Sequence, residues 1–82
     1  MHELSLAIDL VDRAVEVIKK QGPVLPIRIS VLIGPESGVD SEAFAFAFPE
    51  AARGSLLESV QLEIIPGSGR EFSFQSLEVK DV

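Results

Sequence analysis

The fold is decided by residues 27–33, whose sequence is Ile27-Arg28-Ile29-Ser30-Val31-Leu32-Ile33. Isoleucine and valine alternate here with other side chains at the two-residue period of a β-strand, and β-branched residues favour extended structure. Leu32 breaks the polar side of the alternation, so we expect a strand that is central in its sheet or partly covered on both faces. Residues 23–26, Pro-Val-Leu-Pro, are expected to form a stiff connector before it, and residues 34–38 a tight loop after it.

The segment before this strand predicts a long amphipathic helix from about Glu3 to Lys20. Its apolar residues recur at the helical spacing and would form one buried face: Leu4, Ala7, Ile8, Val11, Ala14, Val15 and Ile18. Lysines at the end of the segment suit the negative end of the helix dipole. Gly22 followed by Pro23 is a typical stop signal, so the helix should end just before them.

A second helix is predicted after the strand, from about Ser41 to Arg53, although residues 44–48 also alternate as a strand would. Apolar residues fall at the i, i+3, i+4 and i+7 positions of one helical face: Phe44, Ala47, Phe48 and Ala51. Asp40 or the serine after it would cap the amino terminus, and Gly54 supplies a stop. Pro49 is the objection, because a proline inside a helix costs about 3 kcal/mol. We therefore expect a kink or a break at this position.

Two further strands are predicted in the last third of the chain, one with alternating apolar residues over 60–64 and one that begins near Phe72. Residues 66–69, Pro-Gly-Ser-Gly, predict a short turn, so the two strands should pair as an antiparallel hairpin. In the last strand the apolar phase slips by one residue, and a β-bulge near Gln75-Ser76 explains the slip. The predicted fold is α+β in two layers, with the order α-β-α-β-β and both helices packed on a small three-stranded mixed sheet.

The composition excludes several classes of function. Eighty-two residues are expected to form a single domain. The net charge of −6 argues against nucleic-acid binding, and the absence of cysteine excludes disulfides, thiolate zinc sites and cysteine nucleophiles. One histidine leaves little for enzyme chemistry, so no catalytic activity is expected. Because there is no apolar run of about 18 residues and no signal peptide, the expected location is the cytoplasm.

The only histidine, His2, lies one residue from the amino terminus and forms a chelator with its surroundings. The α-amine of Met1, the amide of His2 and the imidazole Nδ1 would close a five-membered and a six-membered ring around a metal ion. If the helix begins near Leu4, the amides of His2 and Glu3 have no intrahelical acceptor, so a metal breaks no helix bond there. Nitrogen-rich planar chelation suits Ni(II) or Cu(II). Taken alone, such a histidine more often belongs to a frayed surface terminus.

Several stretches follow one another in a recognisable order: Met1-His2-Glu3-Leu4-Ser5, Ile33-Gly34, Ser37-Gly38-Val39-Asp40-Ser41-Glu42-Ala43, Phe46-Ala47-Phe48, Arg53-Gly54-Ser55, Leu62-Glu63-Ile64, and Gly69-Arg70-Glu71-Phe72 through Ser76-Leu77-Glu78-Val79. Together they resemble the nickel-binding domain of the HypA/HybF family, the hydrogenase nickel-incorporation proteins. The opening Met-His-Glu is a weak signal by itself. Its coincidence with the Ser-Gly-Val-Asp loop and the Ser-Leu-Glu-Val tail makes the resemblance specific.

The resemblance implies a metallochaperone that binds Ni(II) through Met1, His2 and Glu3. The resemblance also adds Asp40 as a remote candidate ligand, because the family has an acidic residue after its Ser-Gly-Val that is implicated in nickel binding. A role for Asp40 as the N-cap of the second helix stays equally open. The fourth corner of the nickel site also stays open between the Glu3 amide, a carboxylate, water and a partner.

The implied process is maturation of [NiFe]-hydrogenase, with urease as a second recipient and the GTPase HypB as partner, which would dock on the exposed terminus of the first helix. The alternative is an interaction module that binds a HypB-like GTPase without trafficking metal. A small hydrolase built on His2 is disfavoured, because the histidine lies on a terminus with no supporting residues around it.

One departure from the family concerns zinc. The family normally carries a zinc-binding insertion with two Cys-x-x-Cys pairs between its second and last strands. Residues 66–69 occupy that place here and the chain has no cysteine. We therefore expect residues 1–82 to form a single nickel-binding domain in which a short turn replaces the zinc lobe, and we expect no zinc.

Overall fold

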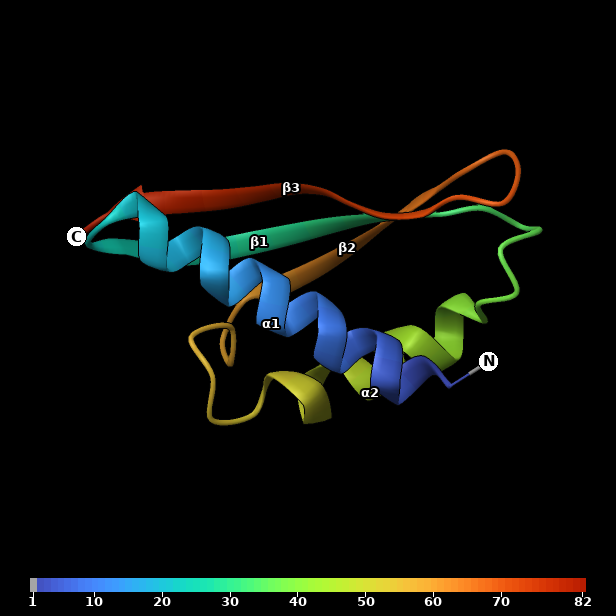
Figure 1. The fold of residues 1–82 in the computed structure, drawn as a ribbon, viewed down its shortest axis with the longest axis horizontal. Coiled ribbons are helices and arrows are strands. Elements are labelled where there is room, and N and C mark those ends of the chain that lie inside the picture. The colour runs from blue at the N-terminus through green and yellow to red at the C-terminus, as the bar shows by residue number, and fades with distance from the viewer. Residues whose placement is uncertain (1) are drawn as a thin grey trace.

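A computed structural model describes residues 2–82 and confirms the two-layer α+β architecture expected from the sequence (Figure 1). The elements are, in order, α1 (Glu3–Gln21), β1 (Val24–Ile33), α2 (Ser41–Ala52), β2 (Gln61–Pro66) and β3 (Phe72–Asp81). The two helices pack against each other and share one hydrophobic core with the inward face of the sheet. Both predicted helices are therefore present, within about a residue of their expected ends.

β1 is the central strand of the sheet, as the pattern of residues 27–33 predicted. β2 pairs with it in parallel, from Arg28 opposite Gln61 to Ile33 opposite Pro66. β3 pairs antiparallel along its other side. The parallel pairing requires a crossover between β1 and β2, and α2 supplies it.

The predicted hairpin between the last two strands is wrong in its pairing. β2 and β3 do run in opposite directions, but β1 lies between them and they are not neighbours. Residues 67–71 instead cross the end of β1: the Gly67 amide donates to the Ile33 carbonyl at 2.9 Å, and the Gly34 amide donates to the Glu71 carbonyl at 2.7 Å. The connection therefore spans two strand spacings, about 9.6 Å, where a hairpin turn would span one.

Gly34 makes this crossing possible because the connection passes directly over it. A Cβ atom on Gly34 would lie 2.2 Å from the Gly69 carbonyl oxygen. That atom belongs to a backbone hydrogen-bonded to Glu36 at 2.8 Å, so it cannot move away freely.

We expect Gly34→Ala to lower the free energy of unfolding by about 1–3 kcal/mol, the usual cost of overpacking a tight site. Gly54→Ala offers a contrast, because nothing lies within 4 Å of its Cβ position and any cost there comes from its positive φ of 76°. Urea denaturation of both variants measures the difference. Equal unfolding free energies for wild type and Gly34→Ala would contradict the close approach.

The Glu71 carboxylate stabilises the same connection by accepting hydrogen bonds from its backbone amides. It accepts hydrogen bonds from the Gly69 amide at 2.7 Å and from the Ser68 amide at 3.4 Å. Its own amide, followed by those of Gly69 and Ser68, lowers the pKa of the Glu71 carboxyl below its ordinary value of 4.5. These bonds favour the charged form, so they stabilise the crossing only while Glu71 is ionised.

This shift predicts how stability depends on pH. A carboxyl whose folded-state pKa is depressed contributes stability above its unfolded-state pKa, and that contribution is lost as the pH falls through the folded-state value. We expect Glu71→Gln to be less stable than wild type near neutral pH, and the difference to shrink as the pH falls below 4.5. Urea denaturation of both proteins across the acid range measures it. A difference that stays constant at acid pH would show that the charge of Glu71 is irrelevant.

The β1–β3 pairing contains two register shifts, one between Pro26 and Arg28 and one between Ser30 and Val31. Ser30 lies opposite Ser76 but Val31 lies opposite Phe74, so Gln75 is an extra residue, and the predicted bulge is confirmed. The prediction of a connector over residues 23–26 is wrong from its second residue on, because β1 begins at Val24. Pro26 is tolerated there because β1 meets β2 only from Arg28 onward, which leaves the earlier residues at an edge.

α2 continues through Pro49, so the expected break is absent, and the helix ends at Ala52. The proline lies on the exposed side of the helix, as does Ala45, whose carbonyl loses its bond to the proline nitrogen. Water can satisfy that carbonyl. The opposite side of α2 carries Phe44, which is fully buried and meets Phe72 of β3 edge to face at 5.4 Å between ring centroids.

Candidate metal-binding site at the helix amino termini

The amino terminus of α1 carries the predicted chelating residues. His2 is the N-cap, with φ −89° and ψ 89°, and its exposed side chain makes no capping hydrogen bond. The first helical bond runs from the Leu6 amide to the His2 carbonyl at 3.1 Å. The amides that precede Leu6 have no acceptor within the helix, as expected for a first turn. Met1, the predicted amine ligand, lies outside the described residues.

The Glu3 side chain joins this terminus to the start of α2. Its Oε2 accepts a hydrogen bond from the Asp40 amide at 3.1 Å, across 37 residues of sequence. The Asp40 amide, followed by the amide of Glu3 itself, lowers the pKa of the Glu3 carboxyl below its ordinary value of 4.5. The sequence predicted a role for the Glu3 backbone amide and gave no sign of this side-chain contact. No local pattern connects the two positions.

Asp40 caps α2, as one of its two interpretations predicted. Its Oδ1 accepts from the Glu42 amide at 3.0 Å and the Ala43 amide at 3.2 Å. Both bonds use the same oxygen, and Oδ2 accepts no hydrogen bond from the described part of the chain. The exposed Asp40 carboxylate therefore retains one oxygen for another ligand, and the N-cap role does not exclude a metal-binding role.

The donor set determines which metal chemistry this site suits. Within residues 2–82, no three side chains of histidine, aspartate, glutamate or cysteine are grouped so that they could hold a metal ion. Binding here would depend on main-chain nitrogens and the imidazole of His2, and the Glu3 side chain links this terminus to Asp40, which carries a further carboxylate. Nitrogen-rich sets of this kind suit Ni(II) and Cu(II), whereas Mg(II) and Ca(II) prefer oxygen.

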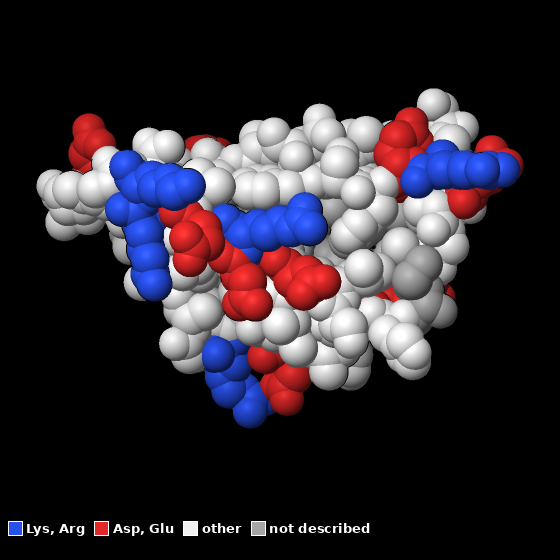
Figure 2. Space-filling model, in the orientation of Figure 1, with Lys and Arg blue, Asp and Glu red and all other residues white. Residues whose placement is uncertain are grey.

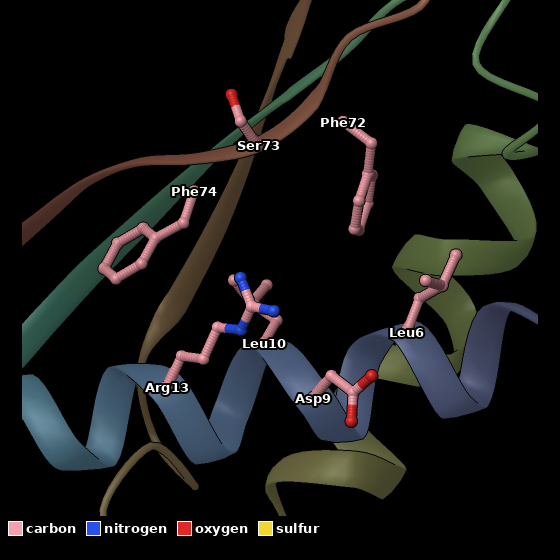
Figure 3. Close-up of a pocket in the computed structure, with 7 residues that line it drawn as sticks. All are labelled: Leu6, Asp9, Leu10, Arg13, Phe72, Ser73 and Phe74. Carbon is pink, nitrogen blue, oxygen red and sulfur yellow. The ribbon is translucent and has the colours of Figure 1, made fainter.

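A groove begins one turn along α1 from Glu3 and lies between α1 and β3 (Figure 3). It has a volume of about 410 Å³ and is lined by Leu6, Asp9, Leu10, Arg13, Phe72, Ser73 and Phe74. The side chain of Arg13 extends from the helix toward the strand, while the rings of Phe72 and Phe74 extend toward the helix. Both phenylalanines pack against the hydrophobic core. They are only partly buried, because β3 is an edge strand.

Charged side chains of both signs lie close together on the surface (Figure 2). On the face shown in Figure 2, lysine and arginine side chains lie beside aspartate and glutamate and form no continuous basic area. None of the helices over residues 2–82 is both long and apolar enough to cross a membrane.

Comparison with known proteins identifies the family. Residues 1–72 match the family model described as HypA, hydrogenase/urease nickel incorporation, metallochaperone. The hydrogenase maturation factor HypA of Chlorobium limicola is 36% identical over 64 residues, and that of Deinococcus radiodurans is 39% identical over 71 residues. That of Chlorobaculum tepidum is 36% identical over 70 residues.

These alignments cover 78%, 84% and 85% of this chain, respectively. They cover 55%, 59% and 62% of the three relatives, so the chain spans less than two thirds of the length of these proteins. The family is described as one of metallochaperones, which agrees with the prediction that the chain is not an enzyme. The chain belongs to the HypA family of hydrogenase/urease nickel-incorporation metallochaperones.

Proposed function

We propose that residues 1–82 form a single nickel-binding domain that binds Ni(II) through Met1, His2 and Glu3 and delivers it during the maturation of a [NiFe]-hydrogenase. Urease is the second proposed recipient. One observation carries the proposal: the exposed imidazole of His2 lies at a helix terminus with free amides, and Glu3 ties that terminus to Asp40. Family membership supports nickel as the cargo. The cytoplasmic location and the absence of zinc stay predictions.

The terminus of α1 suits an ion that must be bound and then released. The amides of His2 and Glu3 make no helix bond, so their deprotonation costs no secondary structure. The helix dipole opposes a cation at this end, but deprotonated amides bring compensating negative charge. Because binding releases protons, affinity should fall as the pH falls. The free Oδ2 of Asp40 is the proposed further ligand.

The proposed partner is a HypB-like GTPase that docks beside the metal site. Leu4 and Ile8 lie one turn apart on α1 and are both exposed, at 45% and 44% of their surface. The groove between α1 and β3 begins at Leu6, on the same half of the helix. Apolar side chains next to the cargo would allow a partner to bind and receive nickel in one encounter.

The test of nickel binding is calorimetry with Ni(II) on protein that has a free Met1 amine, compared with the same chain extended by Gly-Ser at its amino terminus. We expect the extension to abolish nickel binding through the Met1 amine. It converts that amine into a peptide amide and places the new terminal amine two residues farther from His2. Circular dichroism should show the same helix content for both. Equal nickel affinity of the two proteins would contradict the proposed ligand set.

The alternative function, a partner-binding module without metal traffic, is favoured by the groove between α1 and β3, which needs no metal to exist. The extended protein distinguishes the two functions. If it still binds the HypB-like GTPase and the unextended protein binds no nickel, the interaction module is correct. Nickel binding by the unextended protein supports the metallochaperone.

A further inference from the structure

The outward face of α2 presents a phenylalanine to solvent. Phe46 is 89% exposed, whereas Phe44 and Phe48, two residues away on either side, are buried. Two residues correspond to about 200° of helical rotation, so Phe46 points away from the core that the other two rings occupy. No contact within the fold accounts for an aromatic ring at this position.

A shallow groove surrounds this ring. It has a volume of about 590 Å³ and is lined by Phe46, Pro49, Glu50, Arg53 and Glu58. The first four residues come from α2 and its C-cap, and Glu58 comes from the segment that leads to β2. Phe46 and Pro49 are one helical turn apart, so the apolar part of the groove is a rigid surface of two rings.

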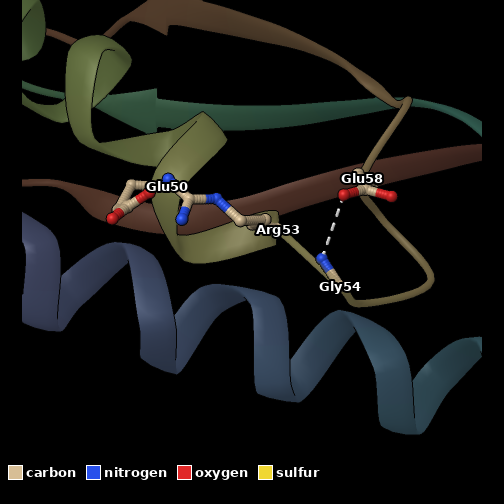
Figure 4. Close-up of polar contacts among 4 residues, drawn as sticks. All are labelled: Glu50, Arg53, Gly54 and Glu58. Carbon is tan, nitrogen blue, oxygen red and sulfur yellow. Dashed lines mark hydrogen bonds and ion pairs between the residues drawn. The ribbon is translucent and has the colours of Figure 1, made fainter.

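The charged side chains of this groove are unequally paired (Figure 4). Arg53 forms an ion pair with Glu50, which leaves Glu58 as the remaining carboxylate of the groove. Glu58 Oε2 accepts from the Gly54 amide at 3.2 Å, and this bond turns the carboxylate back toward the end of α2. Oε1 of Glu58 accepts no hydrogen bond from the described residues. The groove therefore combines an aromatic face with an acidic group that retains a free acceptor.

We propose that this groove binds an arginine side chain of a partner protein, together with an apolar residue next to it. A guanidinium placed over the Phe46 ring gains a cation–π contact, and it can donate to the free oxygen of Glu58. The adjacent apolar side chain lies against Pro49. The net charge of −6 attracts a basic segment to the whole chain. The site shares no residue with the metal site at the amino termini of the two helices, so it goes beyond the proposed nickel function and does not depend on it.

The probe is the capped dipeptide acetyl-leucyl-arginine amide, titrated into 15N-labelled protein. We expect saturable shifts of the amide signals of Phe46, Gly54 and Glu58 at millimolar peptide. The matched peptide carries citrulline, which has the size and shape of arginine without its charge, and it should bind more weakly. Phe46→Ala should weaken arginine-peptide binding by about 2–5-fold, the size of an exposed cation–π contact. Glu58→Gln should weaken it as well.

Leu56→Ala is the control variant, because Leu56 is 52% exposed and lies outside the lining of the groove. It should leave binding unchanged. Equal binding of the citrulline peptide, shifts that lie away from the groove, or no shift at millimolar peptide would overturn the proposal. Sedimentation that shows self-association of the wild type, abolished by Phe46→Ala, would also overturn it, because the occupant would then be a second copy of the chain.

Discussion

His2→Ala is expected to weaken Ni(II) binding by at least about 100-fold while the fold stays intact. The substitution removes the imidazole and one of the two chelate rings, and even the loss of an outer-shell partner costs a metal site about 10–100-fold. The fold should not respond, because the His2 side chain is exposed and makes no capping bond. Calorimetry on free-amine protein measures the affinity, and circular dichroism checks the helix content. Unchanged nickel affinity would remove His2 from the site.

Asp40 provides a matched comparison that separates its two roles. Asp40→Asn retains an oxygen that can cap α2, because asparagine is as good an N-cap as aspartate. It replaces the charged carboxylate by a neutral amide, so a ligand role predicts weaker nickel binding with little change in stability. Asp40→Ala removes both roles and should lower stability by about 1 kcal/mol as well. If Asp40→Asn binds nickel as the wild type does, Asp40 acts only as a cap.

Phe44→Ala is expected to lower the free energy of unfolding by about 3–5 kcal/mol, the usual cost of emptying a buried phenylalanine site. Phe44 is 0% exposed, and its ring packs against Phe48 and Phe72. Small domains have unfolding free energies of about 5–15 kcal/mol, so this single change would remove a large fraction of the total. The melting temperature should fall by more than about 12 °C, because each kcal/mol shifts it by about 4–8 °C in domains of this size.

Phe46→Ala is the control on the same helix. Its ring is 89% exposed, so the unfolding free energy should change by no more than about 0.5 kcal/mol. Thermal denaturation of the two variants side by side measures the contrast. Equal destabilisation by both substitutions would contradict the orientation of α2. When Phe46→Ala is as stable as the wild type, a loss of peptide binding can be assigned to the missing ring rather than to unfolding.

Local patterns of side chains were enough to predict most of the helices and strands. The 3.6-residue period of α1 and the two-residue period of residues 27–33 are properties of neighbouring side chains. α1 formed where it was expected, and β1 covers residues 27–33 but begins three residues earlier, at Val24. The slip of apolar phase in β3 was also visible locally, and it became a bulge at Gln75. The Met-His-Glu start and the later stretches gave the family resemblance, which the comparisons confirmed. The nickel ligands were named from the same stretches and stay predictions.

The way these elements pair and pack could not be predicted from local patterns. The Pro-Gly-Ser-Gly turn was compatible with a hairpin, but the hydrogen bonds of Gly34 and Gly67 carry the chain across β1, and glycine at position 34 leaves room for it. The bond between Glu3 and Asp40 joins residues 37 apart, and no periodicity encodes such a pair. The spacing of side chains can be read directly from the sequence. Strand order and contacts between distant residues depend instead on which backbone groups remain free once the core has packed.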